Sequence, residues 1–218
     1  MTFQKERIVL IRMIMCVAVI TGAQRCLPED VSGVDAAAAF AAQRVLPAPI
    51  RHDIAAGVYA ALVSGAGYHG IQAAGMLVKD EWISIDPVSD SAVPEWLAEL
   101  APLPAELRQA LRRPPVFEAA VFDRSLFPAG TRFISPKLID AVFSRSGPDG
   151  WPEFRRQHKA AGFVSYSQVL ASSDGLDALV YVEASCGGLC GEGVYHWLHR
   201  ARPGSPWSIM KSITSWIA

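Results

Sequence analysis

The sequence predicts an α+β fold in which N-terminal helices pack on a C-terminal antiparallel β-meander. Two observations support this fold class. Before about residue 160, apolar residues recur at helical spacing between proline and glycine breaks. The rest of the chain holds four runs rich in β-branched and aromatic residues, and short turns separate them. Short turns favour antiparallel pairing, because parallel strands need longer crossovers.

Six helical segments are expected, each next to a proline, serine or glycine that starts or stops a helix. Glycine at position 162 is expected to end the last of them. A flexible turn is expected over residues 65–70. The expected helices span residues 34–45, 53–64, 95–100 and 104–113, a segment that begins at Ser135 and Pro136, and residues 153–159.

Strands are expected in two places before the meander and in four runs within it. Side chains alternate between the two faces of a strand, so Ala178 and Val180 should face away from Leu179 and Tyr181. The sheet is expected to bury one of its faces against the helices. The expected strands span residues 76–85, 116–123, 163–170, 176–185, 193–200 and 207–217, with turns at 172–175 and 202–206.

Residues 1–23 are predicted to be a signal peptide, followed by a single α+β domain over residues 24–218. Basic residues precede an apolar stretch over residues 13–20, and Thr21 and Ala23 supply small side chains for cleavage. The apolar run is shorter than the ~20 residues of a membrane-spanning helix, so no membrane span is expected in the mature chain. The chain is therefore expected to be exported, periplasmic or extracellular. A signal anchor in the inner membrane and an ordinary first helix of a cytosolic domain are the alternatives.

The charge of the chain excludes one large class of partners. Its 218 residues carry a formal net charge of −1, so no basic surface is expected to attract nucleic acid. The glycine-rich residues 65–70 lack the lysine that completes a phosphate-binding loop, and no cofactor is predicted. The partner stays unknown, with an envelope protein or a small-molecule ligand as the two expected kinds.

The most distinctive motif is Cys186-Gly-Gly-Leu-Cys190, which lies between two expected strands. Glycines allow positive φ and tight bending, so the two sulfurs can meet in a structural disulfide in an oxidising compartment. A redox-active pair is the alternative, although the usual oxidoreductase spacing is C-x-x-C at the start of a helix. Cys26 is left over as a free, lipidated or intermolecularly paired thiol.

Other polar residues near this motif form a candidate loop site made of Glu183, Glu192 and His196. A zinc site that joins both cysteines to His196 and His199 is not expected, because a strand points these two histidines to opposite faces. The ordinary alternative for the two glutamates is solvation at strand ends. Without a Gly-x-Ser-x-Gly elbow, no residue is assigned a catalytic role.

The order of motifs in the last third of the chain resembles a group of uncharacterised bacterial exported proteins. The motifs are Gly150-Trp-Pro-Glu-Phe154, Gly162-Phe-Val-Ser-Tyr-Ser167, Ala178-Leu-Val-Tyr-Val182, Cys186-Gly-Gly-Leu-Cys-Gly191 and a late pair of tryptophans, Trp207 and Trp216. The resemblance implies an extracytoplasmic α+β domain and no particular activity. We therefore expect a non-enzymatic binding or interaction module, with a small enzyme that uses the cysteine loop for thiol or hydrolytic chemistry as the alternative.

Overall fold

The structure is a computed structural model that describes residues 46, 48–85, 99, 102–112, 121–146 and 150–218. It has the predicted α+β fold, with helices packed on a seven-stranded sheet. The predicted signal peptide, the predicted domain boundary at residue 23, Cys26 and the predicted helices at 34–45 and 95–100 lie outside the described residues, apart from residue 99. Among the residues described, no helix is long and apolar enough to cross a membrane.

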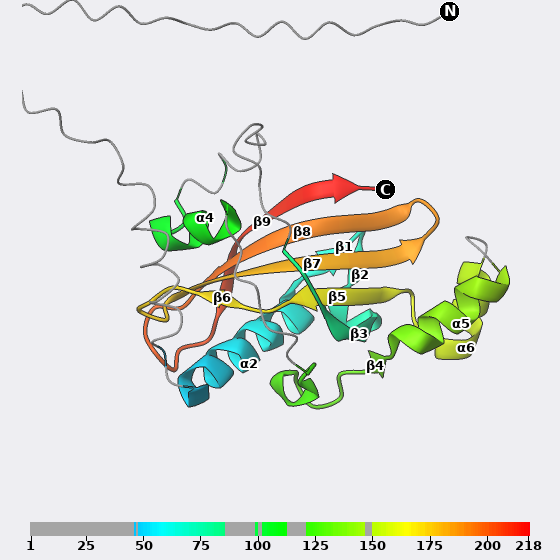
Figure 1. Cartoon of the computed structure of the whole chain (residues 1–218), viewed down its shortest axis with the longest axis horizontal. Coiled ribbons are helices and arrows are strands. Elements are labelled where there is room, and N and C mark those ends of the chain that lie inside the picture. Colours follow the sequence, from blue (N-terminus) through cyan, green and yellow to red (C-terminus); the bar gives the residue numbers. More distant parts are fainter. Residues whose placement is uncertain (1–45, 47, 86–98, 100–101, 113–120, 147–149) are drawn as a thin grey trace, which may run out of the picture. The chain divides into compact units, whose positions relative to one another are not determined.

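The predicted antiparallel meander forms the C-terminal half of the sheet (Figure 1). Each of its neighbouring strands pairs antiparallel, and the turns before and after the hairpin at 187–190 use Gly175 and Gly204 at positive φ. Strand β6 pairs with β7 beside this path. The meander strands are β5 (Phe163–Ser167), β7 (Asp177–Gly187), β8 (Cys190–His199) and β9 (Ser208–Ile217), with the short β6 (Leu170–Ala171).

Two further strands make the sheet mixed rather than purely antiparallel. The predicted strand at 76–85 is confirmed as β3 (Leu77–Ile83), and it pairs parallel with both β4 (Phe133–Ile134) and β5. Three α-helices are described in the stretch of chain between β3 and β5, which has the length that a parallel crossover needs. The order of strands across the sheet is β4-β3-β5-β7-β8-β9.

Helix α2 (Ala48–Gly65) covers one face of the sheet. It begins five residues before the predicted start at Asp53, and Pro49 in its first turn costs no intrahelical hydrogen bond. Gly57 allows the helix to approach Trp207, because a Cβ there would lie 2.7 Å from the indole. The apolar stripe of α2 packs on the even-numbered residues of β7, as the alternation predicted: Ile54, Val58 and Leu62 against Ala178, Val180, Val182 and Ala184.

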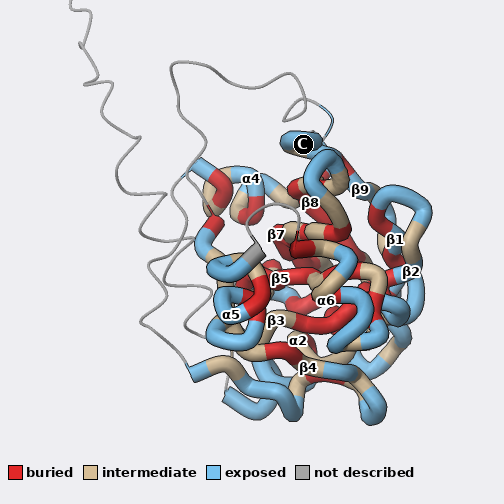
Figure 2. The backbone as a smooth tube through the Cα atoms, turned by 90° about the vertical axis from the view of Figure 1, so that its right-hand side faces the viewer, coloured by how far each residue is buried: buried red, intermediate tan, exposed pale blue. Residues whose placement is uncertain are grey.

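The opposite face of the sheet is also buried in part, which differs from the expectation that one face would pack on helices. Helix α4 (Ala105–Arg112), predicted at 104–113, places Leu107 and Leu111 on Leu179 and Tyr181 of β7. Leu179 and Tyr181 of β7 are thus apolar because they belong to a second core, with Tyr195 and Ile213 of the neighbouring strands. The central strands are accordingly among the most buried parts of the backbone (Figure 2).

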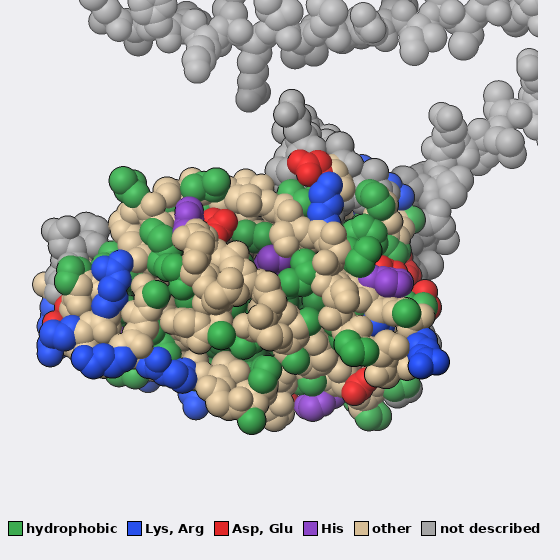
Figure 3. Space-filling view, turned by 180° about the vertical axis from the view of Figure 1, so that it is seen from behind, with side chains coloured by type: hydrophobic (Ala, Val, Ile, Leu, Met, Phe, Trp, Pro, Cys, Tyr) green, Lys and Arg blue, Asp and Glu red, His purple; other side chains and the backbone are tan. Residues whose placement is uncertain are grey.

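Helices α5 (Pro136–Ser146) and α6 (Trp151–His158) form a third cluster beside β3 and β5. Both were predicted, and α6 ends one residue before its predicted end, but the residue that caps it in the left-handed region is Lys159, with a φ of 51°, and not Gly162. Gly162 is required for another reason, since a Cβ there would overlap the carbonyl oxygen of Ser185. Lys and Arg side chains gather toward this end of the sheet (Figure 3), among them the exposed Arg132, Arg155, Arg156 and Lys159.

Two short segments differ from their predicted form. The expected flexible turn at 65–70 contains β1 (Gly67–Tyr68), which forms a small hairpin with β2 (Ile71–Gln72) just after it. The expected strand at 116–123 is described only at residues 121–123, which are not strand. Instead, Phe122 lies with its ring centroid 4.4 Å from that of Trp82, within a cluster of aromatic rings that also includes Tyr59, Phe127, Phe133 and Tyr166.

Candidate functional site

The β7–β8 hairpin is closed by the two cysteines of the distinctive motif. Cys186 and Cys190 are paired as a disulfide, with 5.1 Å between their Cα atoms. Cys186 is buried and Cys190 is half-buried, so the bridge joins the core to the turn. The turn carries Leu189, whose side chain is 89% exposed. The hairpin thus presents an apolar residue on a covalently closed loop.

The glycines of this hairpin are needed because neighbouring side chains approach the backbone closely, and not for the positive φ that the sequence suggested. None of Gly187, Gly188, Gly191 and Gly193 has a φ in the left-handed region. A Cβ at Gly187 would lie 3.2 Å from the Cβ of Cys190, and a Cβ at Gly193 would overlap the indole of Trp216. The hairpin therefore depends on these glycines for space beside the disulfide and beside the last strand.

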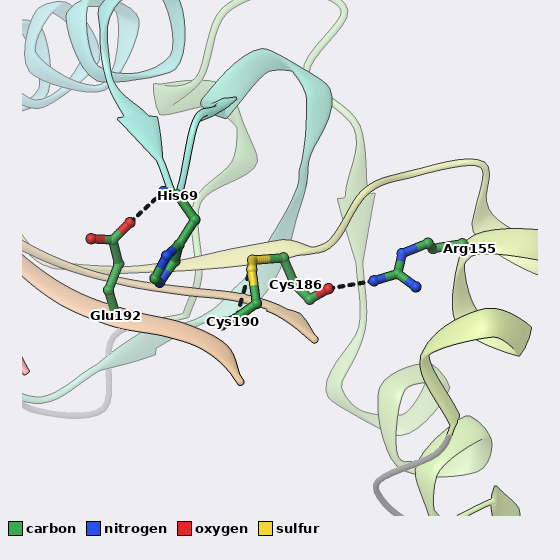
Figure 4. Close-up of a disulfide and its surroundings, with 5 residues drawn as sticks. All are labelled: His69, Arg155, Cys186, Cys190 and Glu192. Atoms are coloured by element: carbon green, nitrogen blue, oxygen red, sulfur yellow. Dashed lines mark hydrogen bonds between the residues drawn. A yellow bond between two sulfur atoms is a disulfide. The ribbon is translucent and has the colours of Figure 1, made fainter. Parts of the chain in front are cut away.

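A side chain from α6 holds the hairpin from one side. Arg155 Nη2 donates a hydrogen bond of 2.7 Å to the carbonyl oxygen of Cys186, while His69 and Glu192 lie on the other side of the disulfide (Figure 4). A charged donor strengthens such a bond. Arg155 was not singled out from the sequence, because nothing in a linear pattern shows that α6 ends beside this hairpin.

The three residues of the predicted loop site are divided between two faces of the sheet. Glu192 pairs with Ala184 across the hairpin, and both face the side of the sheet that α2 covers, as does His196. Glu183 pairs with Gly193 and faces the opposite side. Since directly opposed residues share a face, the sheet itself separates the two glutamates.

Glu192 is not simply solvated at a strand end. Its Oε1 accepts a 2.8 Å hydrogen bond from the backbone N–H of His69, which has a left-handed φ of 47° (Figure 4). This contact ties the β1–β2 turn to β8. Its geometry is that of a carboxylate that secures a strained turn.

His196 is buried and lies far along the strand from the disulfide. Six residues separate it from Cys190, and at roughly 3.3 Å per residue this is about 20 Å. Its Nε2 lies 3.2 Å from the hydroxyl of Tyr68, and its Nδ1 lies 2.8 Å from the hydroxyl of Ser212. Burial lowers the pKa of His196 to about 4, so the imidazole is neutral at pH 7. The structure therefore brings His196 to Tyr68 and Ser212, and not to the cysteines.

Glu183 belongs to a different cluster, which the sequence did not reveal. Glu183, Gly193 and Trp216 lie side by side across β7, β8 and β9. Trp216 Nε1 donates to the hydroxyl of Tyr181 at 2.7 Å, and that hydroxyl donates to Glu183 Oε1 at 3.1 Å. The sequence signal for this cluster was the pair of glycines at alternate positions of β8, Gly191 and Gly193, because they leave room for a large side chain from the neighbouring strand.

A serine, a histidine and an aspartate also meet near the start of α2, but not as a catalytic triad. The hydroxyl of Ser125 donates to Asp123 Oδ1 at 2.6 Å, while His52 Nε2 is 3.5 Å from that hydroxyl. A triad needs the histidine to take the serine proton and the aspartate to hold the other ring nitrogen. Here Asp123 caps the 3-10 turn Arg124–Leu126 through the Ser125 N–H, and these hydrogen bonds lower its pKa.

The metal ligands weighed from the sequence are also apart. His199 Nδ1 lies 3.1 Å from Asp177 Oδ1, on the face away from His196, as the strand alternation predicted. Within the described part of the chain, no three histidine, cysteine, aspartate or glutamate residues are grouped so that they could hold a metal ion.

The site thus consists of a disulfide-closed hairpin with one face on the side of α2, where Glu192 and His196 make structural contacts, and a more open face that carries Glu183 and Trp216. No family model, no curated protein and no solved structure matches the chain.

Proposed function

We propose that the chain is an exported binding module, periplasmic or extracellular, that contacts its partner through the tip of the β7–β8 hairpin. The observation that carries this proposal is an exposed apolar residue on a covalently closed turn. Leu189 is 89% exposed, and Ile217 of the adjacent strand is 69% exposed. The N–H of Ala218 donates to Gly191 O at 2.8 Å, which keeps the end of β9 next to the hairpin.

A closed loop favours binding because its conformation is set before the partner arrives. Ordering a flexible loop on binding costs free energy, and a disulfide removes part of that cost. Exposed apolar side chains gain free energy when a partner covers them. The tip, defined as Leu189 and Ile217, combines both properties.

Site-specific crosslinking tests the tip directly. A photoreactive amino acid replaces Leu189 in the full chain within its host, and the matched control places it at Leu138, an apolar residue of α5 that is 52% exposed. We expect a discrete crosslinked species from position 189 and none from position 138. Equal crosslinking at both positions, or at neither, contradicts the proposed role of the tip.

Mass spectrometry of the protein recovered from its host tests the proposed location. We expect an N-terminus at Gln24 and a mass that lacks the two hydrogens of the free thiols at Cys186 and Cys190. An intact chain that retains Met1, with both cysteines free, contradicts export. A retained leader in the membrane fraction supports the signal-anchor alternative.

Thiol or hydrolytic catalysis at the cysteines is the alternative function. Thiol labelling of the folded protein distinguishes it, because an activated thiolate reacts quickly at neutral pH whereas a stable disulfide does not react. We expect no labelling of Cys186 or Cys190 without reductant. Rapid labelling together with reduction of a model disulfide substrate favours the enzyme.

A further inference from the structure

The open face of the hairpin carries a flat aromatic surface next to a carboxylate. A Cβ at Gly191 would lie 3.3 Å from Trp216 Cζ3, and a Cβ at Gly193 would overlap the other ring of the indole. The indole of Trp216 therefore lies across two glycines of β8, with one face on the backbone. Trp216 is 39% exposed, so its opposite face is open to solvent.

The position of this indole is fixed by hydrogen bonds. Trp216 Nε1 donates to the hydroxyl of Tyr181, which is itself buried and donates to Glu183. The hydroxyl of Ser215 donates to Gly193 O at 3.0 Å and fastens the same stretch of β9 to β8. The aromatic face and the carboxylate are thus held in a set arrangement before any ligand is present.

The charge of Glu183 is uncompensated within this arrangement. Its hydrogen-bond partner is the neutral hydroxyl of Tyr181, and among the described residues no lysine, arginine or histidine forms an ion pair with it. An indole face also attracts cations, through the quadrupole of the ring. Both groups therefore favour a positively charged ligand.

We infer that Trp216 and Glu183 form a binding site for a guanidinium group, supplied by an arginine side chain of the partner. A guanidinium is planar, stacks on a single aromatic face and donates two parallel hydrogen bonds to one carboxylate. A quaternary ammonium is bound best when several aromatic walls surround it, and here one face is open. This inference rests on the proposed binding function and names the chemistry of the partner.

A titration of the full chain with blocked arginine tests the inference. The probe is N-acetyl-arginine amide, its neutral isostere is the citrulline analogue, and the signal is the indole N–H of Trp216 in a nitrogen–proton correlation spectrum. The substitution Trp216→Phe identifies that signal by its loss. We expect a saturable shift with arginine and binding of citrulline at least about tenfold weaker, because only arginine gives charge-assisted hydrogen bonds. Equal responses to the two probes would overturn the inference.

Matched variants separate the carboxylate from the fold. Glu183→Gln keeps an acceptor for Tyr181 and removes the charge, so arginine binding should weaken by at least about tenfold while the Trp216 signal stays in place. Glu192→Gln makes the same change on the opposite face and should leave arginine binding unaltered. Unchanged binding in Glu183→Gln, or an equal loss in both variants, would overturn the inference.

Two further comparisons fix the source of the guanidinium and the link to the proposed function. Free arginine should bind no more tightly than the blocked form, since tighter binding of the free amino acid would overturn the assignment to a partner protein. Crosslinking from Leu189 without arginine binding would contradict the guanidinium site and leave the proposed role of the tip intact. Arginine binding without crosslinking from Leu189 would instead contradict the proposed role of the tip.

Discussion

The two faces of the β7–β8 hairpin share one backbone but differ in how far their polar side chains are buried and hydrogen-bonded. On the side of α2, His196 is buried, neutral and hydrogen-bonded at both ring nitrogens. On the other side, Trp216 is partly exposed and Glu183 carries a charge without an ion-pair partner among the described residues. Polar groups on the first face are used to complete a core, whereas those on the second are arranged at a surface.

The difference comes from what covers each face. Helix α2 and the β1–β2 hairpin pack on the first face, where Tyr68 contacts His196 and Glu192 fastens the turn at His69. Helix α4 covers the second face near the start of β7 and lies away from the β7–β8 turn (Figure 1). A polar residue near that turn is therefore structural on one face and available for binding on the other.

The largest expected effect compares a truncation on each face. Leu198→Ala leaves a cavity on the filled face and should lower the free energy of unfolding by roughly 3 kcal/mol. Trp216→Ala removes a partly exposed side chain and should cost about 1 kcal/mol. Urea unfolding of both variants measures the difference. Equal losses would mean that the second face is packed as tightly as the first.

Acid should weaken the filled face through His196. Its pKa is about 4 in the folded protein and about 6.5 in an unfolded chain, so the unfolded state binds more protons between these values. Stability from this group is complete above pH 6.5 and is lost as the pH falls toward 4, by about 3 kcal/mol.

The variant His196→Gln isolates this effect, because every other titrating group is retained. Unfolding free energies at pH 7 and pH 4 should differ less in the variant than in the natural sequence. A pH dependence that is identical in the two proteins contradicts a buried neutral imidazole.

The disulfide joins β7 to β8 at the turn, and its loss should have a moderate effect. A loop this short is expected to contribute about 2 kcal/mol by restricting the unfolded chain. The double variant Cys186→Ala, Cys190→Ala should lose that amount in urea unfolding. Reductant should lower the stability of the natural sequence and have no effect on the variant, and a reductant effect of equal size in both would point to another cause.

The smallest expected effect on stability is at the tip. Leu189→Ser changes an exposed side chain and should alter the free energy of unfolding by less than about 0.5 kcal/mol. Crosslinking from a photoreactive residue at Ile217 should nevertheless fall in this variant if the tip binds a partner. A large loss of stability would show that Leu189 is part of the fold.

Much of the fold could be predicted because its signals are local. The turns at Gly175 and Gly204, the alternation along β7 and the helix start at Pro136 all depend on residues close in the sequence. The end of α6 was predicted to within one residue, but the prediction that the glycine at 162 ends it was wrong, because Lys159 adopts the left-handed conformation that caps the helix.

The candidate site could be predicted only where one strand determines it. The opposite orientation of His196 and His199 follows from the period of a strand and is confirmed. The contact of Glu192 with His69, of Glu183 with Tyr181 and of Trp216 with Gly193 needed the packing of other elements.

The sequence by itself determined which residues form the meander, how its side chains alternate and where the two cysteines could meet. Only the tertiary structure decided that β3 lies parallel beside β5, that a second helix covers the other face, and that Glu183 and Glu192 serve different surroundings. The physical reason is how far apart in the sequence the interacting residues lie. Strand period and turn conformation are set by neighbouring residues, whereas burial, pairing and the charge around a group depend on segments that are distant along the chain.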